Sequence, residues 1–458
     1  MSLYVNNDTI YALATAPGKA GIAVIRLSGP KTIEICEKLT EKEIPKPHYA
    51  RIRSFYHPKT SDLLDNGLLL FMPNPHSFTG EDVAEFQIHG GPAIIAAFLE
   101  ALSHFKQARL AEPGEFSRRA FLNGKLDLTE IEALADLIHA QTQMQHRLAL
   151  RQMGGSLTTL YQKWREDLKK SLAYLEAFLD FPDEDLPESI NPVLYENVQR
   201  LKAELAAHLN DQQIGEKIRE GFYVSITGLP NAGKSTLLNY LAKRDVAIVT
   251  DIAGTTRDPV EVEMNIGGYP VVLIDTAGLR ETTDIVESIG IKKALEKAEH
   301  ADFNILLLEG KSLRELQKDL STLNEFLPFE SERLLVINKS DLLSKEDLQS
   351  LRSSLSHTHQ PIFISLKDGL GIDHFKDALL AFFSSHFTLP EGPLITRERH
   401  RVHLQKCLIA LESFLINPDQ VLAAEDLRQA MHQLGTITGI VDVEDLLDVI
   451  FRDFCIGK

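Results

Sequence analysis

The residues best suited to chemistry lie at positions 228–235, which read Gly-Leu-Pro-Asn-Ala-Gly-Lys-Ser. This is the G-x-x-x-x-G-K-S/T pattern, and it stands between a predicted buried strand, 222–227, and a predicted helix, 236–242. In that setting, backbone N–H groups and the helix N-terminus hold phosphate oxygens. Lys234 is expected to meet the β- and γ-phosphates, and Ser235 to bind Mg²⁺. The predicted phosphate-binding residues are Asn231, Ala232, Gly233, Lys234, Ser235 and Thr236.

A second motif predicts which base is bound. Residues 338–341 read Asn-Lys-Ser-Asp and follow a predicted strand, 334–337. The Asp341 carboxylate can accept hydrogen bonds from both N1–H and N2–H₂ of guanine, a donor pair that adenine lacks. The sequence therefore predicts GTP rather than ATP. Residues 365–367 resemble the weaker Ser-Ala-Lys guanine loop, with Leu366 in place of alanine. The predicted base-binding residues are Asn338, Lys339, Ser340, Asp341, Ser365, Leu366 and Lys367.

Two further segments lie between these motifs in the sequence. Asp275 follows a predicted strand, 271–274, and begins Asp-Thr-Ala-Gly, where a carboxylate holds the water shell of Mg²⁺. Thr256 is the expected switch threonine, which closes on Mg²⁺ and the γ-phosphate. The remaining predicted GTP contacts are Thr250, Asp251, Ile252, Ala253, Gly254, Thr255, Thr276, Ala277 and Gly278.

The sequence also raises a question about hydrolysis. Many GTPases orient the attacking water with a glutamine directly after D-x-x-G. Here that position is Leu279, whose apolar side chain cannot orient water, so another group is needed. The next residues offer three carboxylates, Glu281, Asp284 and Glu287, and the residue types alone do not choose among them.

The elements around these motifs indicate several domains. Residues 1–122 read as mixed α/β, with predicted strands at 21–27, 67–72 and 83–88. Residues 123–219 are predicted to be helical, with Asp127 and Glu130 forming a capping box. Strands and helices alternate in 220–384, which indicates a doubly wound G domain. Residues 385–458 are helical again. We therefore expect a discontinuous helical domain into which a P-loop, Ras-like α/β domain is inserted.

Composition restricts the class of protein. The chain has 458 residues, 44% of them hydrophobic, and no apolar run long enough to span a membrane. It shows no secretory signal, and its three cysteines (Cys36, Cys407 and Cys455) are far apart. This pattern suits a reducing cytoplasm. The net charge of −17 is a poor match for bare nucleic acid, so contact with RNA requires a local basic patch or a more basic partner.

The chain resembles the MnmE (TrmE) family of tRNA-modification GTPases, within the TrmE-Era-EngA superfamily. The resemblance covers essentially the whole chain and is carried by residues 230–236, residues 250–258 and the C-terminal Phe-Cys-Ile-Gly-Lys, 454–458. It implies K⁺ in the position of an arginine finger, and it assigns Glu287 as the acid that positions the water. The implied K⁺ ligands are Asn231, Thr250, Ile252 and Thr255.

The same resemblance implies a folate site in the N-terminal domain. It would bind 5-formyltetrahydrofolate or another tetrahydrofolate derivative through Arg26, Glu85, Lys125 and Lys458. A carboxylate such as Glu85 can read the pterin edge, and cations can meet the glutamate tail. Cys455 is either a reactive thiol near the folate or a spectator, and the sequence does not decide between them.

The family's activity implies the partners. Its members install an aminomethyl or carboxymethylaminomethyl group at C5 of the wobble uridine of certain tRNAs. They act as homodimers, joined through the N-terminal domains, with the FAD-dependent partner MnmG in a heterotetramer. The one-carbon unit comes from folate and the amine from glycine or ammonium. The alternative is an Era/EngA-like ribosome-assembly switch, although the chain has one P-loop and no KH pattern. The two clearest basic runs lie at 118–119 and 397–401. The second follows the G domain, and it is either a solvated hinge or a contact to the tRNA backbone.

Overall fold

The computed structural model describes residues 8–180, 190–229, 231–244, 261–275, 301–326, 333–355, 360–387 and 389–441, and five positions beyond them. The chain divides into two compact units. The first comprises Met1–Ala135, Met153–Gln199 and Lys406–Lys458, and the second comprises Asp136–Gln152 and Arg200–Gln405. Among the described helices, none is long and apolar enough to cross a membrane.

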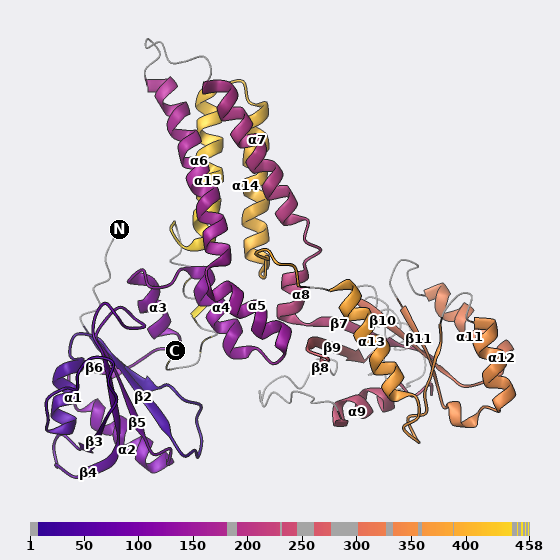
Figure 1. Cartoon of the computed structure of the whole chain (residues 1–458), viewed down its shortest axis with the longest axis horizontal. Coiled ribbons are helices and arrows are strands. Elements are labelled where there is room, and N and C mark those ends of the chain that lie inside the picture. The colour runs from indigo at the N-terminus through magenta and orange to yellow at the C-terminus, as the bar shows by residue number, and fades with distance from the viewer. Residues whose placement is uncertain are drawn as a thin grey trace, which may run out of the picture. The chain divides into compact units, whose positions relative to one another are not determined.

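The first unit contains a mixed sheet of order β3-β4-β5-β2-β1-β6, in which only the β1–β6 pair is parallel (Figure 1). The strands are β1 (Thr9–Leu13), β2 (Ala23–Ser28), β3 (Arg51–Tyr56), β4 (Leu63–Met72), β5 (Val83–Ile88) and β6 (Ala108–Leu110). Successive side chains of strand β5 point to opposite faces of the sheet. Phe86 therefore packs in the core formed with helices α1 (Thr32–Thr40) and α2 (Pro92–Ser103). Glu85 therefore faces the other side of the sheet.

The helical domain of the first unit is built from two distant chain segments, as predicted. Helices α4 (Leu128–His139), α6 (Ser156–Asp180) and α7 (Ile190–Leu209) precede the inserted domain, and α14 (Glu398–Ile416) and α15 (Gln420–Thr438) follow it. Helix α15 packs along α6, and Tyr195 of α7 stacks near Phe414 of α14 with ring centroids 5.3 Å apart. The capping box at Asp127 is confirmed, since its backbone N–H and its carboxylate each bond Glu130 at 2.8 Å.

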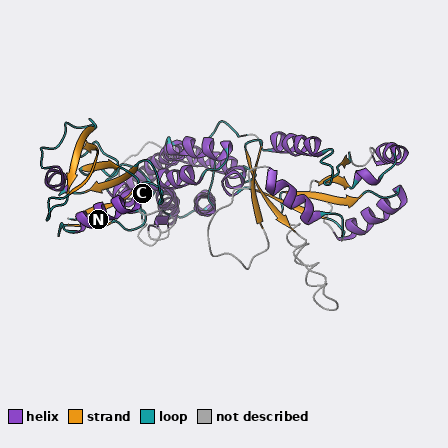
Figure 2. Ribbon diagram, turned by 90° about the horizontal axis from the view of Figure 1, so that it is seen from below, coloured by secondary structure: helices purple, strands orange, loops and turns teal. Residues whose placement is uncertain are grey.

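The second unit contains the predicted doubly wound sheet, of order β12-β11-β10-β7-β9-β8. Its strands are β7 (Phe222–Thr227), β8 (Glu261–Ile266), β9 (Tyr269–Asp275), β10 (Phe303–Glu309), β11 (Arg333–Asn338) and β12 (Ile362–Phe363). Only β8 is antiparallel to its neighbour. Helices α9 (Lys234–Arg244), α11 (Leu313–Phe326), α12 (Lys345–Leu355) and α13 (Ile372–His386) cover the sheet, as the view along it shows (Figure 2).

Two short helices belong to the inserted domain, although they fall largely within 123–219, which the sequence predicts to be helical without separating them. Helix α5 (Gln143–Met153) and helix α8 (Ile214–Glu220) contribute Leu148 and Ile218 to the core of the inserted domain. Arg219 Nε donates to the Thr396 carbonyl at 2.9 Å, which fastens the chain before β7 to the chain after α13. The inserted domain therefore carries α5 and α8 as part of its own unit.

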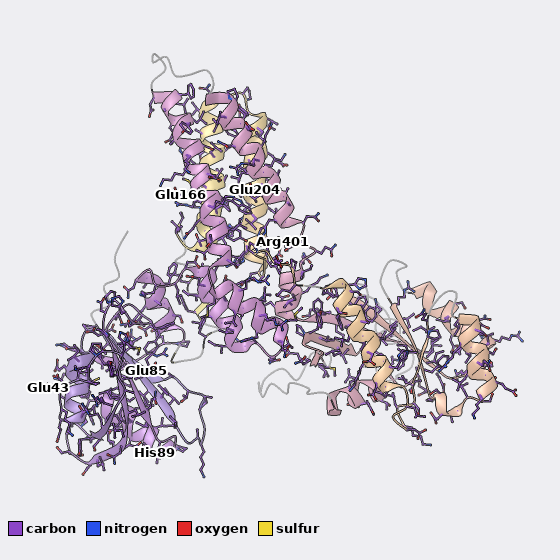
Figure 3. The ribbon with its side chains drawn as sticks, in the orientation of Figure 1. Glu43, Glu85, His89, Glu166, Glu204 and Arg401 are labelled. Carbon is purple, nitrogen blue, oxygen red and sulfur yellow. The ribbon has the colours of Figure 1, made fainter. Side chains whose placement is uncertain are left out.

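Arg401 ties the same two chain connections together, and its position is marked in Figure 3. Its guanidinium donates to Glu216 of α8 at 2.7 Å, to Asp211 at 2.8 Å and to the Leu209 carbonyl at 3.1 Å. Its side chain is 8% exposed. Arg119 is similarly buried and pairs with Asp8, Glu81 and Glu115. Neither arginine is a solvated surface charge, so the interpretation of residues 397–401 as a solvated hinge or a tRNA contact is wrong at Arg401.

Replacing Arg401 with methionine should destabilise the second unit by about 3–5 kcal/mol, because Glu216 and Asp211 would stay buried without their cation. Urea unfolding followed by circular dichroism measures this loss. The matched control is Arg428→Met, which removes an exposed pair with Glu176 and should cost no more than about 1 kcal/mol. Equal losses in the two variants would contradict the buried clamp.

Candidate functional site

The predicted phosphate loop connects β7 to α9 at the carboxyl ends of the parallel strands, where ligands bind in this type of sheet. Asn231 and Gly233 have φ angles of 66° and 100°, so the loop turns through the left-handed region. The Lys234 ammonium donates to the carbonyls of Gly228 at 2.7 Å and Leu229 at 3.1 Å. It therefore lies over the loop, in reach of phosphates held there.

Asn338 joins the predicted motifs into one site. Its side chain is 3% exposed. Its Nδ2 donates to the Ala232 carbonyl in the phosphate loop at 2.9 Å, and its Oδ1 accepts from the Leu366 N–H at 3.3 Å. A Cβ at Gly233 would overlap Asn338 Nδ2, so only glycine allows this approach. One buried amide thus connects the phosphate loop, the Asn-Lys-Ser-Asp turn and the Ser-Leu-Lys loop.

The base-binding loops are held mainly by backbone bonds. Ser340 N–H donates to the Ile364 carbonyl at 3.0 Å, which places the Asn-Lys-Ser-Asp turn beside the Ser-Leu-Lys loop. Ser365 Oγ accepts from the Asp368 N–H at 3.2 Å and closes that loop. The side chains of Asp341 and Lys367 are exposed. The Asp341 carboxylate is therefore accessible for bonds to a guanine edge.

Two of the residues expected at Mg²⁺ lie on elements next to the phosphate loop. Asp275, the last residue of β9, is the register partner of Ile226, two residues before the phosphate loop. Ser235 lies in the first turn of α9. A hydroxyl and a carboxylate are hard oxygen ligands and suit Mg²⁺. The predicted residues that lie outside the described part of the chain are Thr250 to Thr256, Thr276, Ala277, Gly278, Leu279, Glu281, Asp284 and Glu287.

The predicted folate residues Arg26 and Glu85 meet on the side of the first sheet that faces away from α1 and α2. They are register partners on β2 and β5, and Arg26 Nε donates to Glu85 Oε1 at 3.0 Å. The Arg26 guanidinium also lies 5.4 Å from the ring centre of Phe78 and 5.6 Å from that of Phe116. Figure 3 marks Glu85 on the sheet. A guanidinium, a carboxylate and two aromatic rings suit a pterin, which combines a flat ring with a polar edge.

Of the other two residues predicted to bind folate, Lys125 and Lys458, only the first lies among the described residues. Lys125 donates to the Pro75 carbonyl at 3.0 Å and so braces the segment that carries Phe78, without a described bond to Arg26 or Glu85. Lys458 and Cys455 lie outside the described residues. A Cβ at Gly457 would overlap the Leu13 carbonyl, so the C-terminal segment reaches β1, the neighbour of β2. Sequence analysis missed Phe78 and Phe116 because no motif marks them.

One other cluster has the residue types of a metal site. Glu100 accepts from His57 Nε2 at 3.0 Å and lies 2.7 Å from His104 Nε2. However, His57 Nδ1 accepts from the backbone N–H groups of Lys59 and Thr60, so the ring proton must lie on Nε2. That nitrogen has no lone pair for a metal. We therefore interpret the cluster as a hydrogen-bond network.

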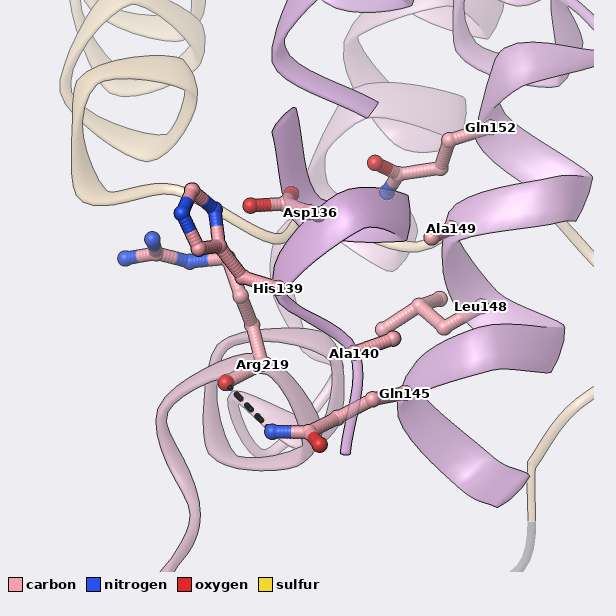
Figure 4. A pocket seen from close by; sticks show the side chains of 8 residues that line it. All are labelled: Asp136, His139, Ala140, Gln145, Leu148, Ala149, Gln152 and Arg219. Atoms are coloured by element: carbon pink, nitrogen blue, oxygen red, sulfur yellow. Dashed lines mark hydrogen bonds between the residues drawn. The ribbon is translucent and has the colours of Figure 1, made fainter. Parts of the chain in front are cut away.

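The pocket in Figure 4 has about 220 Å³ and lies between α4, α5 and α8. Its lining includes Gln145 and Gln152, whose amides already bond the Arg219 carbonyl and Thr396. Ligand pockets usually have about 300–1,000 Å³, so this volume is too small for a nucleotide. The pocket belongs to the packing of the junction.

Gly233→Ala should reduce GTP affinity by at least about tenfold, because the added methyl group pushes Asn338 away from Ala232, a change worth about 1.4 kcal/mol or more. Equilibrium binding of a fluorescent GTP analogue measures this loss. Gly392→Ala is the control, since a Cβ there meets nothing within 4 Å, and it should bind like the unmodified chain. Unchanged affinity in Gly233→Ala would contradict the role assigned to Asn338.

Comparison with known proteins covers the whole chain. Residues 9–125 match the model of the GTP-binding protein TrmE N-terminus, and residues 128–455 match the model of the MnmE helical domain. A tRNA modification GTPase MnmE from Parvibaculum lavamentivorans is 49% identical over 98% of this chain and 100% of its own length. The mitochondrial 5-taurinomethyluridine tRNA synthase subunit GTPB3 of Danio rerio is 46% identical over 99% of this chain and 93% of its own length.

Among solved structures, the G domain of the T. maritima FeoB iron transporter is 25% identical and covers 35% of this chain and 98% of its own. Its TM-score of 0.27 is too low to support a fold assignment. The family models and the full-length relatives are sufficient: the chain belongs to the MnmE family of tRNA modification GTPases.

Proposed function

We propose that this GTPase acts with the FAD-dependent partner MnmG to add a carboxymethylaminomethyl or aminomethyl group at C5 of the wobble uridine of certain tRNAs. The observation that carries the proposal is the presence, in one chain of this family, of two distinct sites. One is the loop cluster joined by Asn338, which suits GTP. The other is the Arg26–Glu85 pair with its two aromatic rings, which suits a folate.

In the GTP site, each residue has a separate task. Lys234 neutralises charge on the β- and γ-phosphates, and Asp341 selects guanine. Ser235, Thr256 and Asp275 would hold Mg²⁺, directly or through its water shell, and Mg²⁺ when bound supplies positive charge to the phosphates. Glu287 orients the attacking water, in place of the glutamine that Leu279 replaces.

K⁺ completes this arrangement. Asn231, Thr250, Ile252 and Thr255 would bind it through amide, hydroxyl or carbonyl oxygens, and when bound it supplies the charge that an arginine finger gives elsewhere. Asn231 has a φ of 66° and an exposed side chain at the edge of the phosphate loop, which is compatible with this task.

In the folate site, Glu85 would read the pterin edge, while Arg26, Lys125 and Lys458 provide cations for the glutamate tail. A bound tetrahydrofolate supplies the one-carbon unit.

The protein works as a homodimer through its N-terminal domains and with MnmG as a heterotetramer. Because the chain carries a net charge of −17, a local patch or the partner provides most of the positive charge for tRNA. Its buried free thiols Cys36 and Cys407 suit the reducing cytoplasm, where we place it.

GTP turnover should rise by at least about tenfold when K⁺ replaces Na⁺ at equal ionic strength and constant Mg²⁺, because K⁺ offsets charge that develops on the phosphates. Release of inorganic phosphate measures the rate. Asn231→Ala should lose most of this stimulation and keep the slow rate in Na⁺. Equal rates in the two salts for the unmodified chain would refute the K⁺ assignment.

Glu287→Ala should lower kcat by about 10²–10⁴-fold, as expected when a group that positions or deprotonates water is lost. GTP affinity should stay within about twofold, since Glu287 acts on the water and not on the nucleotide. Single-turnover hydrolysis and analogue binding give the two values. Glu281→Ala and Asp284→Ala are the neighbouring controls and should retain kcat. A loss of affinity in Glu287→Ala would indicate a structural role instead.

A further inference from the structure

Glu309 is a charged residue of the GTP site that no motif includes. It ends β10 and is the register partner of Asn338 on β11. Its Oε1 accepts from Lys339 Nζ at 2.6 Å, within the distance range of a strong charge-assisted bond. Its side chain is 25% exposed and that of Lys339 is 35% exposed, so the pair lies at the rim of the site.

The backbone at this point is fixed independently of the side chains. Lys339 has a φ of 59°, in the left-handed region that residues with a Cβ rarely adopt. The Gly310 N–H donates to the Asn338 carbonyl at 2.7 Å, which joins the end of β10 to the start of the turn. The Lys339 Cα is therefore held by the turn and its Nζ by Glu309.

A lysine fixed at both ends presents its methylene chain as a surface. A free lysine side chain has considerable rotamer entropy, which a ligand that orders it must otherwise overcome. The face of a purine ring packs well against such a chain and interacts favourably with a nearby cation. Ordering Lys339 before the nucleotide arrives would therefore strengthen binding without any new contact to the nucleotide.

The charges around Glu309 are consistent with this arrangement. The hydrogen bond from Lys339 is the largest influence that lowers the pKa of Glu309, so the carboxylate stays ionised at neutral pH. Lys311 lies 3.6 Å from the second oxygen of Glu309 and 3.6 Å from Asp319 on α11. Lys311 thus has its own acidic partner, and Asp319 offers a control that leaves the Glu309–Lys339 pair intact.

We propose that Glu309 is a positioning residue for guanine nucleotides: its ion pair holds the Lys339 side chain extended as a platform for the face of the base. The inference rests on the proposed function in one respect, that Lys339 contacts the base. Glu309 itself touches neither the nucleotide nor the reacting phosphates. Because a platform contacts the ring face, it acts on every purine alike, whereas Asp341 reads the edge and discriminates among purines.

The test uses the full chain and the fluorescent mant derivatives of GDP and a non-hydrolysable GTP analogue. Glu309→Ala should raise both dissociation constants about two- to tenfold, mainly through faster dissociation, as expected for a rim ion pair. At saturating GTP, kcat should stay within about twofold. The ratio of GTP affinity to ITP affinity should not change, since inosine differs only at the edge. Asp319→Asn should bind like the unmodified chain.

A double-mutant cycle with Lys339→Ala, which removes the side-chain surface, separates this role from a general structural one. If Glu309 acts through Lys339, then adding Glu309→Ala to Lys339→Ala causes no further loss of affinity. Three results would overturn the proposal: unchanged dissociation constants in Glu309→Ala, the same loss from Glu309→Ala in the unmodified and the Lys339→Ala chains, or unmodified affinity in Lys339→Ala. In the last case the base contact would be absent, while the GTPase assignment would stand. Failure of the unmodified chain to bind GTP at all would instead refute the proposed function.

Discussion

The buried guanidinium of Arg401 fixes the chain connections of the inserted domain. A domain inserted into another must have its two chain connections side by side. Arg401 lies in the first turn of the returning helix α14, and its side chain bonds Asp211 and Glu216, which lie before β7. Burying these charges has a high desolvation cost, which is offset only while every partner stays in place. These bonds therefore favour one local geometry within the second unit, to which α5 and α8 also belong.

The same unit contains a continuous backbone connection between the GTP site and α5. Strands β8 and β9 form a hairpin, and Asp275 stands at the end of β9 nearest the phosphate loop. At the opposite end of the hairpin, the Gly268 carbonyl accepts from the Met144 N–H of α5 at 3.2 Å. Met144 also packs against the core of the inserted domain. Paired backbone therefore connects the end of β9 near the phosphate loop to α5.

Much of this could be predicted from sequence, for physical reasons that are local. The phosphate loop, the capping box at Asp127 and the strand–helix alternation after Phe222 depend on neighbouring residues, and the structure has all of them. The discontinuous helical domain was also predictable, because helical periodicity returns after the inserted domain. The antiparallel strand β8 was not predicted. Helices α5 and α8 were predicted only as part of the helical stretch 123–219, because their packing partners in the inserted domain are distant in sequence.

The partners of the charged residues were harder to predict, because the position of a charged residue in the sequence does not indicate which residue it pairs with. Arg26 reads as a charge at the end of a strand, and only the register of β2 with β5 brings it to Glu85. Arg401 was interpreted as part of a solvated hinge or a tRNA contact, and its burial depends on Asp211 and Glu216, which lie far away in the sequence. In each case the deciding contact is non-local.

We propose that GTP hydrolysis by this chain serves modification of the wobble uridine. The most direct measurement is mass-spectrometric nucleoside analysis of tRNA from cells that lack the chain, with and without the restored gene. The account predicts that the C5-substituted wobble uridines disappear without the chain and return with it, but do not return with a Glu287→Ala copy. Unchanged wobble uridines in cells that lack the chain would contradict the account and would favour a role in ribosome assembly.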